Sequence, residues 1–335
     1  MATDRPQLPE PRGPASQAIV DYLSGRGPAP SVECAVTTTE DDRQLALYVS
    51  YELHYGSFAG VDDRAEWDLA VLALRAALEA SFEEQLLAEV DPPECSPKAV
   101  GDTLFRLAEA DEGPSLARHL EAYGDVEQFR EFMVHRSAYQ LKEADPHTWA
   151  IPRITGDAKS ALVEVQADEY GSGDPERMHS RLFAKSMDAL GLDSRYGAQI
   201  DRLPEATLAT VNLISLFGLH RRWRGALVGH LAMFEITSPG PNRRYGRALR
   251  RLGYGKEATE FYDEHVEADS VHENIAAYDL AQGLAVAEPS LTRDILFGAQ
   301  ALLALDARMA AEILTAWERG ESSLRAMQVP SVANT

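Results

Sequence analysis

Cysteine is scarce in this chain of 335 residues. The two cysteines, Cys34 and Cys95, both lie in the first third and lack the C-x-x-C spacing of a thiolate metal site. Two isolated thiols cannot form the disulfide framework of a small secreted domain. We therefore exclude a disulfide-stabilised fold, a thiolate metal centre and a cysteine nucleophile in the later part of the chain.

Basic residues are fewer than acidic ones, and long apolar runs are missing. The 53 acidic residues outnumber the 32 basic ones, which gives a net charge of −21. This charge repels nucleic acid and anionic membranes, so we expect neither as a partner. No apolar stretch is long enough to cross a bilayer, and the segment MATDRPQLPEPRGPASQ lacks the apolar core of a signal peptide. We therefore expect a soluble, cytoplasmic protein.

Strand-like alternation of apolar and polar residues is absent as well, and nearly every segment after residue 100 has helical periodicity. The sequence therefore predicts an all-α fold. Proline-rich and glycine-rich segments divide the chain. We expect a mobile arm (1–32), an N-terminal helical subdomain (33–92), a main helical domain (93–322) and a tail (323–335). In the main domain the candidate helices are 101–109, 114–122, 125–143, 157–169, 175–190, 205–222, 224–236, 241–251, 256–286 and 289–319.

A motif with metal-binding chemistry lies in the candidate helix 256–286. It reads His265-Val-Glu-Ala-Asp269-Ser-Val-His272. Residues at i, i+4 and i+7 of an α-helix lie within about 40° of one another around the axis, so the two imidazoles and the carboxylate share one face. Such ligands suit iron, manganese or zinc. One helix cannot surround a metal ion, so the remaining ligands must come from other helices.

Three further ligand-type residues lie on predicted apolar helix faces, where helical bundles place their metal ligands. Glu143 shares a face with Phe132, Glu169 follows Val165 by one turn, and His179 opens the next candidate helix. Burying an unpaired carboxylate costs on the order of several kcal/mol, so two inward-facing glutamates require a cation or a proton. A metal ion provides the cation.

Together these residues make a set of three carboxylates and three imidazoles: Glu143, Glu169, His179, His265, Asp269 and His272. A catalytic zinc keeps three protein ligands, so six are too many for it. Six suit two irons with coordination positions left for dioxygen. The pair of Glu-x-x-His motifs that marks ferritin-like di-iron proteins is absent.

This set resembles that of the haem-oxygenase-like di-iron oxidases and oxygenases. In that family a glutamate on one core helix, a glutamate followed ten residues later by a histidine, and a late H-x-x-x-D-x-x-H motif hold a non-haem di-iron centre. The six residues named above occupy all of these positions. The resemblance covers about residues 40–320 and implies a haem-oxygenase-like helical bundle, whose H-x-x-x-D-x-x-H helix orders fully when iron binds. It also implies a homodimer supported by the N-terminal subdomain.

The same resemblance implies an oxidoreductase with two iron ions, no haem, dioxygen as co-substrate and an external electron donor as a partner. We expect it to oxidise a small amine or amino-acid-like substrate in specialised metabolism, with N-oxygenation favoured. Desaturation or C–C cleavage by the same centre is the alternative. Some relatives carry a C-terminal cupin domain; this chain ends after its helical domain, so we expect no second reaction. The substrate, the reductant and the choice between two irons and a manganese–iron pair stay open.

Candidate substrate-binding residues are Arg136, Tyr139 and Arg153. The first two precede Glu143 by seven and four residues and share its predicted face. Either arginine can pair with a substrate carboxylate, or neutralise a neighbouring acid in this acidic chain. Four other residues are expected outside the ligand set, either next to it or in a structural helix pair: His147, His220, His230 and Glu235.

Three other protein classes would require different residues. A haem-degrading enzyme of the same fold needs one axial histidine and no six-ligand set. A thiaminase-like hydrolase needs a cysteine in the main domain, where there is none after Cys95. A non-catalytic helical interaction protein has no reason to place three acids inward. Metal analysis distinguishes all three from a di-iron enzyme.

Overall fold

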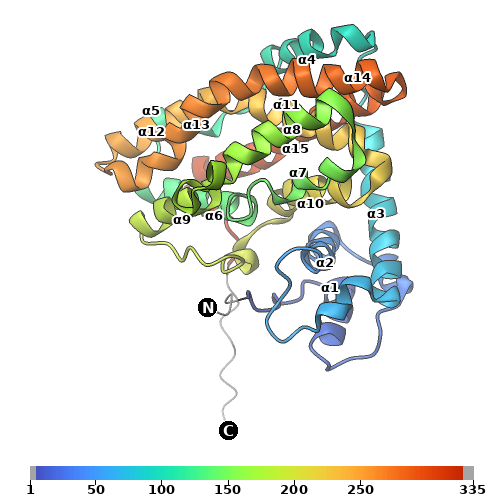
Figure 1. Ribbon diagram of the computed structural model, residues 1–335. Coiled ribbons are helices and arrows are strands. Elements are labelled where there is room, and N and C mark those ends of the chain that lie inside the picture. Colours follow the sequence, from blue (N-terminus) through green and yellow to red (C-terminus); the bar gives the residue numbers. More distant parts are fainter. Residues whose placement is uncertain (1–4, 327–335) are drawn as a thin grey trace.

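The computed structural model describes residues 5–326, except for the side chains of residues 267–271. All regular secondary structure in this range is helical (Figure 1). The prediction of an all-α bundle is therefore confirmed. Among the described helices, none combines the length and the apolarity that crossing a membrane requires.

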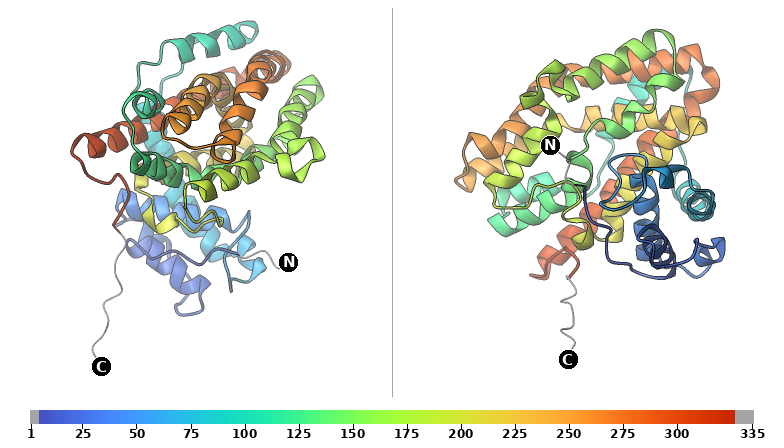
Figure 2. Two further views of the ribbon diagram at one scale, coloured as in Figure 1. Left: turned by 90° about the vertical axis from the view of Figure 1, so that its left-hand side faces the viewer. Right: turned by 60° about the horizontal axis from the view of Figure 1, so that its bottom comes forward.

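A small N-terminal layer lies at one end of the larger bundle (Figures 1 and 2). It contains α1 (Pro14–Leu23) and α2 (Glu40–Glu52). Asp42 is fully buried and accepts hydrogen bonds from the backbone N–H groups of Ala15 and Ser16, at 2.9 and 2.8 Å. Because these N–H groups open α1 and have no partner within it, Asp42 fixes the start of this helix from the neighbouring one. The segment expected as an arm therefore contains an anchored helix.

The longer helix α3 (Leu69–Glu89) runs from this layer along the side of the bundle (Figure 1). The bundle itself consists of α4 (Val100–Glu109), α5 (Leu116–Ala122), α6 (Val126–Gln140), α7 (Asp145–Thr148), α8 (Gly156–Glu169), α9 (His179–Ala189), α10 (Glu205–Leu219), α11 (Arg224–Thr237), α12 (Pro239–Arg251), α13 (Lys256–Asn274), α14 (Gly283–Ala287) and α15 (Thr292–Glu318).

Two glycines let the central helices α11 and α15 approach closely. A Cβ atom on Gly229 would lie 1.7 Å from the carbonyl oxygen of Ile295, and one on Gly298 would lie 1.9 Å from that of Ala226. Real atoms do not come this close, so only glycine fits at either position. This contact sets the spacing of the bundle around the buried polar residues described below.

The helix predicted to end at Glu143 ends earlier, at Gln140. A turn follows, in which Ala144 has a φ of 75°, and Pro146 stands at the start of α7. Proline lacks a backbone N–H group and clashes with the carbonyl of the residue four positions earlier, so α6 could not run through residue 146 without a break. The amide of Gln166 on α8 donates a hydrogen bond of 2.9 Å to the carbonyl of Ala144. Glu143 therefore projects from a braced turn rather than from a helix.

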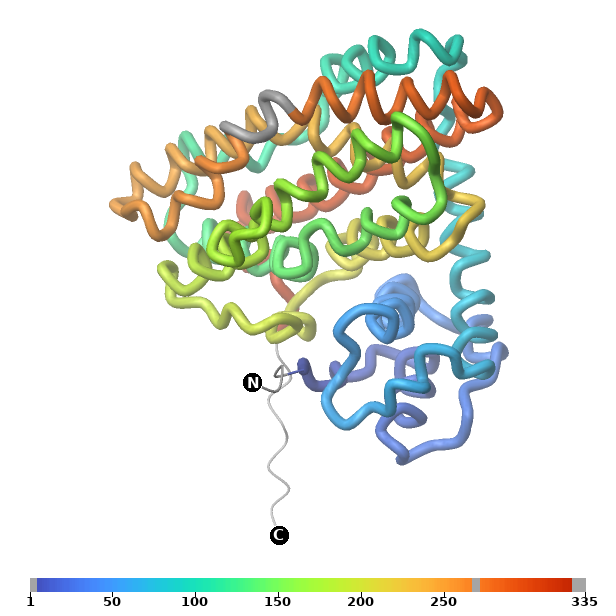
Figure 3. The backbone as a smooth tube through the Cα atoms, viewed as in Figure 1, coloured from blue at the N-terminus to red at the C-terminus, as the bar shows by residue number. Residues whose placement is uncertain are grey.

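The predicted helix 256–286 is one continuous helical path with a change of winding (Figure 3). After α13, residues Ile275–Gln282 form a π-helix that leads into α14. π-helical turns are rare and are often found at functional sites. The π-helical segment packs against α8 and α11, both of which carry polar residues of the buried site.

Two buried histidines make the stability of the fold depend on pH. Burial lowers the pKa of His135 to about 3 and that of His147 to about 4. The unfolded chain binds a proton at each imidazole near pH 6.5, whereas the folded chain does not until the pH falls to these lower values. The free energy of unfolding should therefore fall by about 1.4 kcal/mol per pH unit for each histidine as the pH drops from about 6.5 to 4.

Urea unfolding at a series of pH values measures this effect. A His135→Gln variant should show a shallower fall with decreasing pH than the parent protein. Parallel curves for the two proteins would show that His135 does not contribute.

Candidate metal centre

Four of the predicted ligands meet inside the bundle. The ligand atoms of Glu143, Glu169, His179 and His265 all lie within 4.8 Å of one another, and all four side chains are buried. They come from the turn after α6, the last residue of α8, the first residue of α9 and the middle of α13. The imidazoles of His179 and His265 are adjacent, with ring centroids 4.2 Å apart. Residues far apart in the sequence therefore form one polar cluster in an apolar interior.

His265 is oriented for ligation by a backbone contact. Its Nδ1 lies 2.7 Å from the carbonyl oxygen of Phe261. Because a carbonyl only accepts hydrogen bonds, Nδ1 must carry a proton, so in the neutral ring Nε2 holds the lone pair that a metal ion would bind. This Nε2 lies 3.5 Å from Oε1 of Glu143. A hydrogen bond on the far ring nitrogen is the usual way in which proteins hold a metal-binding histidine.

A second group lies next to the first and contains a residue that the sequence interpretation placed elsewhere. Ligand atoms of Glu169, Glu235 and His272 lie within 4.8 Å of one another. Glu235 was interpreted as part of a structural helix pair, but it is buried on α11 and one of its oxygens lies 3.7 Å from Nδ1 of His272. The apolar face shared with the buried Leu231, one turn earlier, is the signal that could have identified it.

His272 also has a partner outside the predicted set. Its Nε2 lies 2.9 Å from a carboxylate oxygen of Asp168, whose side chain is about half exposed. This contact directs Nδ1 toward Glu235 and Glu169. Carboxylate–histidine pairs of this kind orient ligands and increase their basicity.

Glu169 belongs to both groups and lies between them. A carboxylate has two oxygens with about four lone pairs, so one glutamate can bind two cations. Five of the six predicted ligands are thus brought together, and Glu235 joins them. The side chain of the sixth, Asp269, lies outside the described residues.

The electrostatics of the cluster show that its carboxylates are stabilised by positive charge close to them. Burial raises the pKa of Glu143. Burial alone would also raise the pKa of Glu169, but the charges of His179 and His265 outweigh it and lower that pKa to about 2. Burial alone would lower the pKa of His179, but the carboxylate of Glu169 raises it. The glutamates therefore depend on neighbouring positive charge to remain ionised.

Several ligand atoms have no hydrogen-bond partner among the described residues. They are Oε2 of Glu143, Nδ1 of His179 and Nδ1 of His272. The second of these lies only 2.9 Å from Glu169, without the geometry of a hydrogen bond. An unpaired buried polar atom is costly, and a metal ion between the groups would satisfy all of these atoms. The residues present therefore fit a pair of divalent cations with oxygen and nitrogen ligands.

The predicted substrate residues lie in different places. Tyr139 lines the small hollow around Glu143 and Glu169. Arg136 lines a neighbouring cavity. The guanidinium of Arg153 instead donates hydrogen bonds to the carbonyl oxygens of Gly218 and Leu219 at the end of α10, and it lines neither space.

The remaining histidines surround the centre or lie away from it. His147 lines the hollow, and its Nε2 lies 3.0 Å from Nδ1 of His230, so these two form a buried pair beside the ligands. His220 lies 3.0 Å from Glu79 of α3 instead. None of the three is in either ligand group of the described residues.

Comparison with known proteins places the main domain among iron proteins. Residues 130–307 match the model of the family described as iron-containing redox enzyme. Nitrosourea synthase of Streptomyces achromogenes subsp. streptozoticus is 25% identical over 199 residues, which cover 58% of this chain and 42% of that protein. The matching region thus spans less than half of that relative.

Two solved structures are also similar. One is a domain of unknown function with a heme oxygenase-like fold from Shewanella denitrificans OS217, with 12% identity, a TM-score of 0.49, and coverage of 74% of this chain and 98% of that chain. The other is a CADD-like protein of unknown function from Nostoc punctiforme PCC 73102, with 15% identity, a TM-score of 0.47, and coverage of 72% and 96%.

Proposed function

This chain belongs to the family of iron-containing redox enzymes, and on that premise we propose that it is a non-haem di-iron oxygenase or oxidase. Its co-substrate is dioxygen, and its substrate is a small amine or amino-acid-like molecule. The observation that carries the proposal is that two buried ligand groups share Glu169. When bound there, two ferrous ions would supply electrons for the reduction of dioxygen.

The ligands divide between the two ions. Glu143, His179 and His265 would hold one ion, Glu235 and His272 would hold the other, and Glu169, which belongs to both groups, would be available to either. We also propose Asp269 as a ligand, because it lies one turn from His265 on the same helix face. Nitrogen and carboxylate ligands without a thiolate are typical of non-haem iron.

Other residues of the chain keep water away from the centre. Phe183 and Phe261 are buried, with ring centroids 5.1 Å apart, and the ring centroid of Phe261 lies 4.2 Å from that of His265. Tyr139 extends its hydroxyl toward His147, at 3.5 Å, so a proton donor stands at the edge of the hollow. An enclosed, dry site protects reactive oxygen species from reduction by solvent-borne donors.

N-oxygenation is the reaction that we favour. A nitrosourea carries a nitroso group, in which oxygen is bound to nitrogen, so the name of the relative nitrosourea synthase supports oxidation at nitrogen. Desaturation or C–C cleavage by the same centre is the second candidate. Product analysis by mass spectrometry after aerobic incubation with an amine and amino-acid panel separates the two. Fragmentation of the carbon chain without any oxygenated nitrogen would favour the second.

Iron loading tests the proposal itself. Anaerobic titration with Fe(II) should end at about two irons per chain, measured by a colorimetric iron assay after removal of free metal. Addition of dioxygen should then produce a transient visible absorption that decays faster in the presence of the substrate. A limit of one iron per chain, or tight binding of haem, would contradict a di-iron enzyme.

The proposed partners are an external electron donor and a second copy of the chain. The exposed side chains of Trp67 and Leu69 support a homodimer formed through the N-terminal subdomain, because exposed large apolar residues are common at interfaces.

A further inference from the structure

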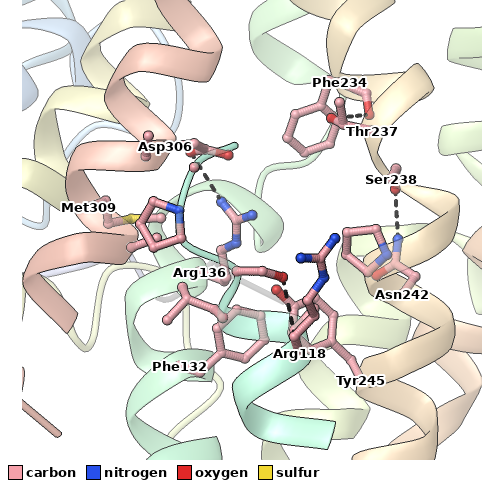
Figure 4. Close-up of a pocket in the computed structure, with 18 of the residues that line it drawn as sticks. Arg118, Phe132, Arg136, Phe234, Thr237, Ser238, Asn242, Tyr245, Asp306 and Met309 are labelled. Atoms are coloured by element: carbon pink, nitrogen blue, oxygen red, sulfur yellow. Dashed lines mark hydrogen bonds and ion pairs between the residues drawn. The ribbon is translucent and has the colours of Figure 1, made fainter. Parts of the chain in front are cut away.

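A cavity of about 280 Å³ lies beside the metal centre (Figure 4). It is lined mainly by residues of α5, α6, α11, α12, α13 and α15, and by the segment between α4 and α5. Phe234 and Ser238 line both this cavity and the hollow around the ligands, so the two spaces adjoin. Ligand pockets commonly measure about 300–1,000 Å³, so this one suits a molecule of amino-acid size.

An arginine and an aspartate face each other in the cavity without hydrogen bonds. Arg136 of α6 and Asp306 of α15 form an ion pair at 3.7 Å, and their side chains are only 23% and 32% exposed (Figure 4). Neither side chain makes a hydrogen bond within the described part of the chain. A guanidinium has five N–H donors, and largely buried donors without acceptors are costly. This pair is therefore open to further partners.

Two neighbouring polar groups are also unsatisfied. Gln140 lies one turn after Arg136 on α6, and Tyr262 lies on α13; both are at least nine-tenths buried and line the cavity. The amide oxygen of Gln140 and the hydroxyl of Tyr262 have no hydrogen-bond partner among the described residues. The hydroxyl of Tyr262 can donate a hydrogen bond, whereas the amide oxygen of Gln140 can only accept one. A ligand that carries both an anion and N–H groups would therefore find partners on both residues and on Arg136.

We propose that this cavity binds a zwitterionic α-amino acid, with the carboxylate on Arg136 and the ammonium on Asp306. The inference rests on the proposed function and specifies its substrate class. The carboxylate and the ammonium of an α-amino acid are attached to one carbon, so together they match two opposite charges that lie 3.7 Å apart. A simple amine on Asp306 would compete with Arg136 for its carboxylate partner and offer Arg136 no anion in return, and a simple acid on Arg136 would do the same to Asp306.

The placement also determines which part of the substrate reacts. Gln140, the last residue of α6, lies about 6 Å along the helix from Arg136, and Glu143 stands in the turn that follows α6. An amino acid held at Arg136 can extend its side chain past Phe234 and Ser238, which line both spaces, toward the ligands. The α-nitrogen remains on Asp306, so the side chain, and not the α-amine, is oxidised.

Calorimetric titration tests the inference. The iron-loaded protein is kept anaerobic, so that binding occurs without turnover, and the common L-α-amino acids are added one at a time. At least one should bind, and Arg136→Met should raise its Kd by at least about 30-fold, as expected for the loss of one partner of a buried charge pair. Asp306→Asn should have a similar effect. Arg293→Met is the matched control, because Arg293 is exposed on α15 and does not line the cavity.

Analogues of the bound amino acid separate recognition from folding. The same molecule without its carboxylate should bind the parent protein and Arg136→Met equally, and the molecule without its α-amine should bind the parent protein and Asp306→Asn equally. Absence of binding by every amino acid, or an equal loss for all three molecules in each variant, would overturn the inference. Iron stoichiometry and reaction with dioxygen are measured separately, so a failure here leaves the di-iron proposal standing. If iron does not bind, the titration of the metal-free protein still reports on the cavity.

Discussion

Replacement of Glu169 by glutamine is expected to empty both metal positions. Glu169 is the residue common to the two ligand groups of the described residues, so its charge would act on both of the proposed ions. The amide of glutamine is neutral and cannot bridge two cations as a carboxylate does. We expect the affinity for each iron to fall by more than about 100-fold, the upper limit for changes in groups that only support a ligand. Oxidation of substrate should be lost with it.

The other glutamates should behave differently, and this difference identifies the bridge. Glu235→Gln should reduce iron binding from about two ions to about one per chain, because Glu235 belongs only to the group with His272. Glu164→Gln should leave binding unchanged, because Glu164 lies on α8, as Glu169 does, but is exposed. Iron stoichiometry after anaerobic loading measures all three variants, with circular dichroism to check folding. Retention of two irons by Glu169→Gln would contradict the shared role.

Loss of the carboxylate of Glu52 should destabilise the whole protein. Oε2 of Glu52 lies 3.0 Å from Nζ of Lys142, and the two side chains are 0% and 5% exposed. Tyr196 donates a hydrogen bond of 2.6 Å to the same carboxylate, and the ring of Tyr55 lies 4.2 Å from Nζ. Glu52→Gln leaves a buried ammonium without its counter-charge. Such a change costs about 3–5 kcal/mol of the free energy of unfolding.

The same contact joins the N-terminal layer to the metal centre. Glu52 is the last residue of α2, and Lys142 stands next to Glu143 in the turn after α6. Glu52→Gln should therefore also weaken iron binding, because the turn that presents Glu143 loses an anchor. Urea unfolding of the metal-free protein measures the first effect and iron titration the second.

A double variant separates the loss of the ion pair from the cost of leaving one buried charge unpaired. Glu52→Gln combined with Lys142→Met removes both charges, so it should be more stable than Glu52→Gln alone. Glu84→Gln, at an exposed position of α3, serves as the control and should change stability by less than about 0.5 kcal/mol. If the double variant is no more stable than the single one, the buried charge is not the cause.

The local sequence pattern was sufficient to predict the helices and one face of the site. Helical periodicity depends on neighbours within two turns, so the all-α fold could be predicted without any knowledge of packing. The spacing of His265 and His272 on one helix face has the same local origin. The family was also recognised from the ligand set, and the match over residues 130–307 confirms it.

The composition of the ligand groups and the details of the site depend on contacts between segments that are distant in the sequence. Which glutamate lies between the two groups, and that Glu235 completes one of them, depend on how α8, α11 and α13 pack in space. The end of α6 at Gln140 depends on the turn that follows it, which a hydrogen bond from α8 holds in place. The distance of 3.7 Å between Arg136 and Asp306 depends on the separation of α6 and α15.

The helical class of this protein, the faces of its helices and most of its candidate ligands follow from the 3.6-residue period of the chain alone. Which side chains meet depends instead on how the helices pack. Distances across a bundle are set by close contacts such as those at Gly229 and Gly298, where the absence of a Cβ atom lets two helices approach. Such contacts join residues far apart in the chain, and no local pattern specifies them.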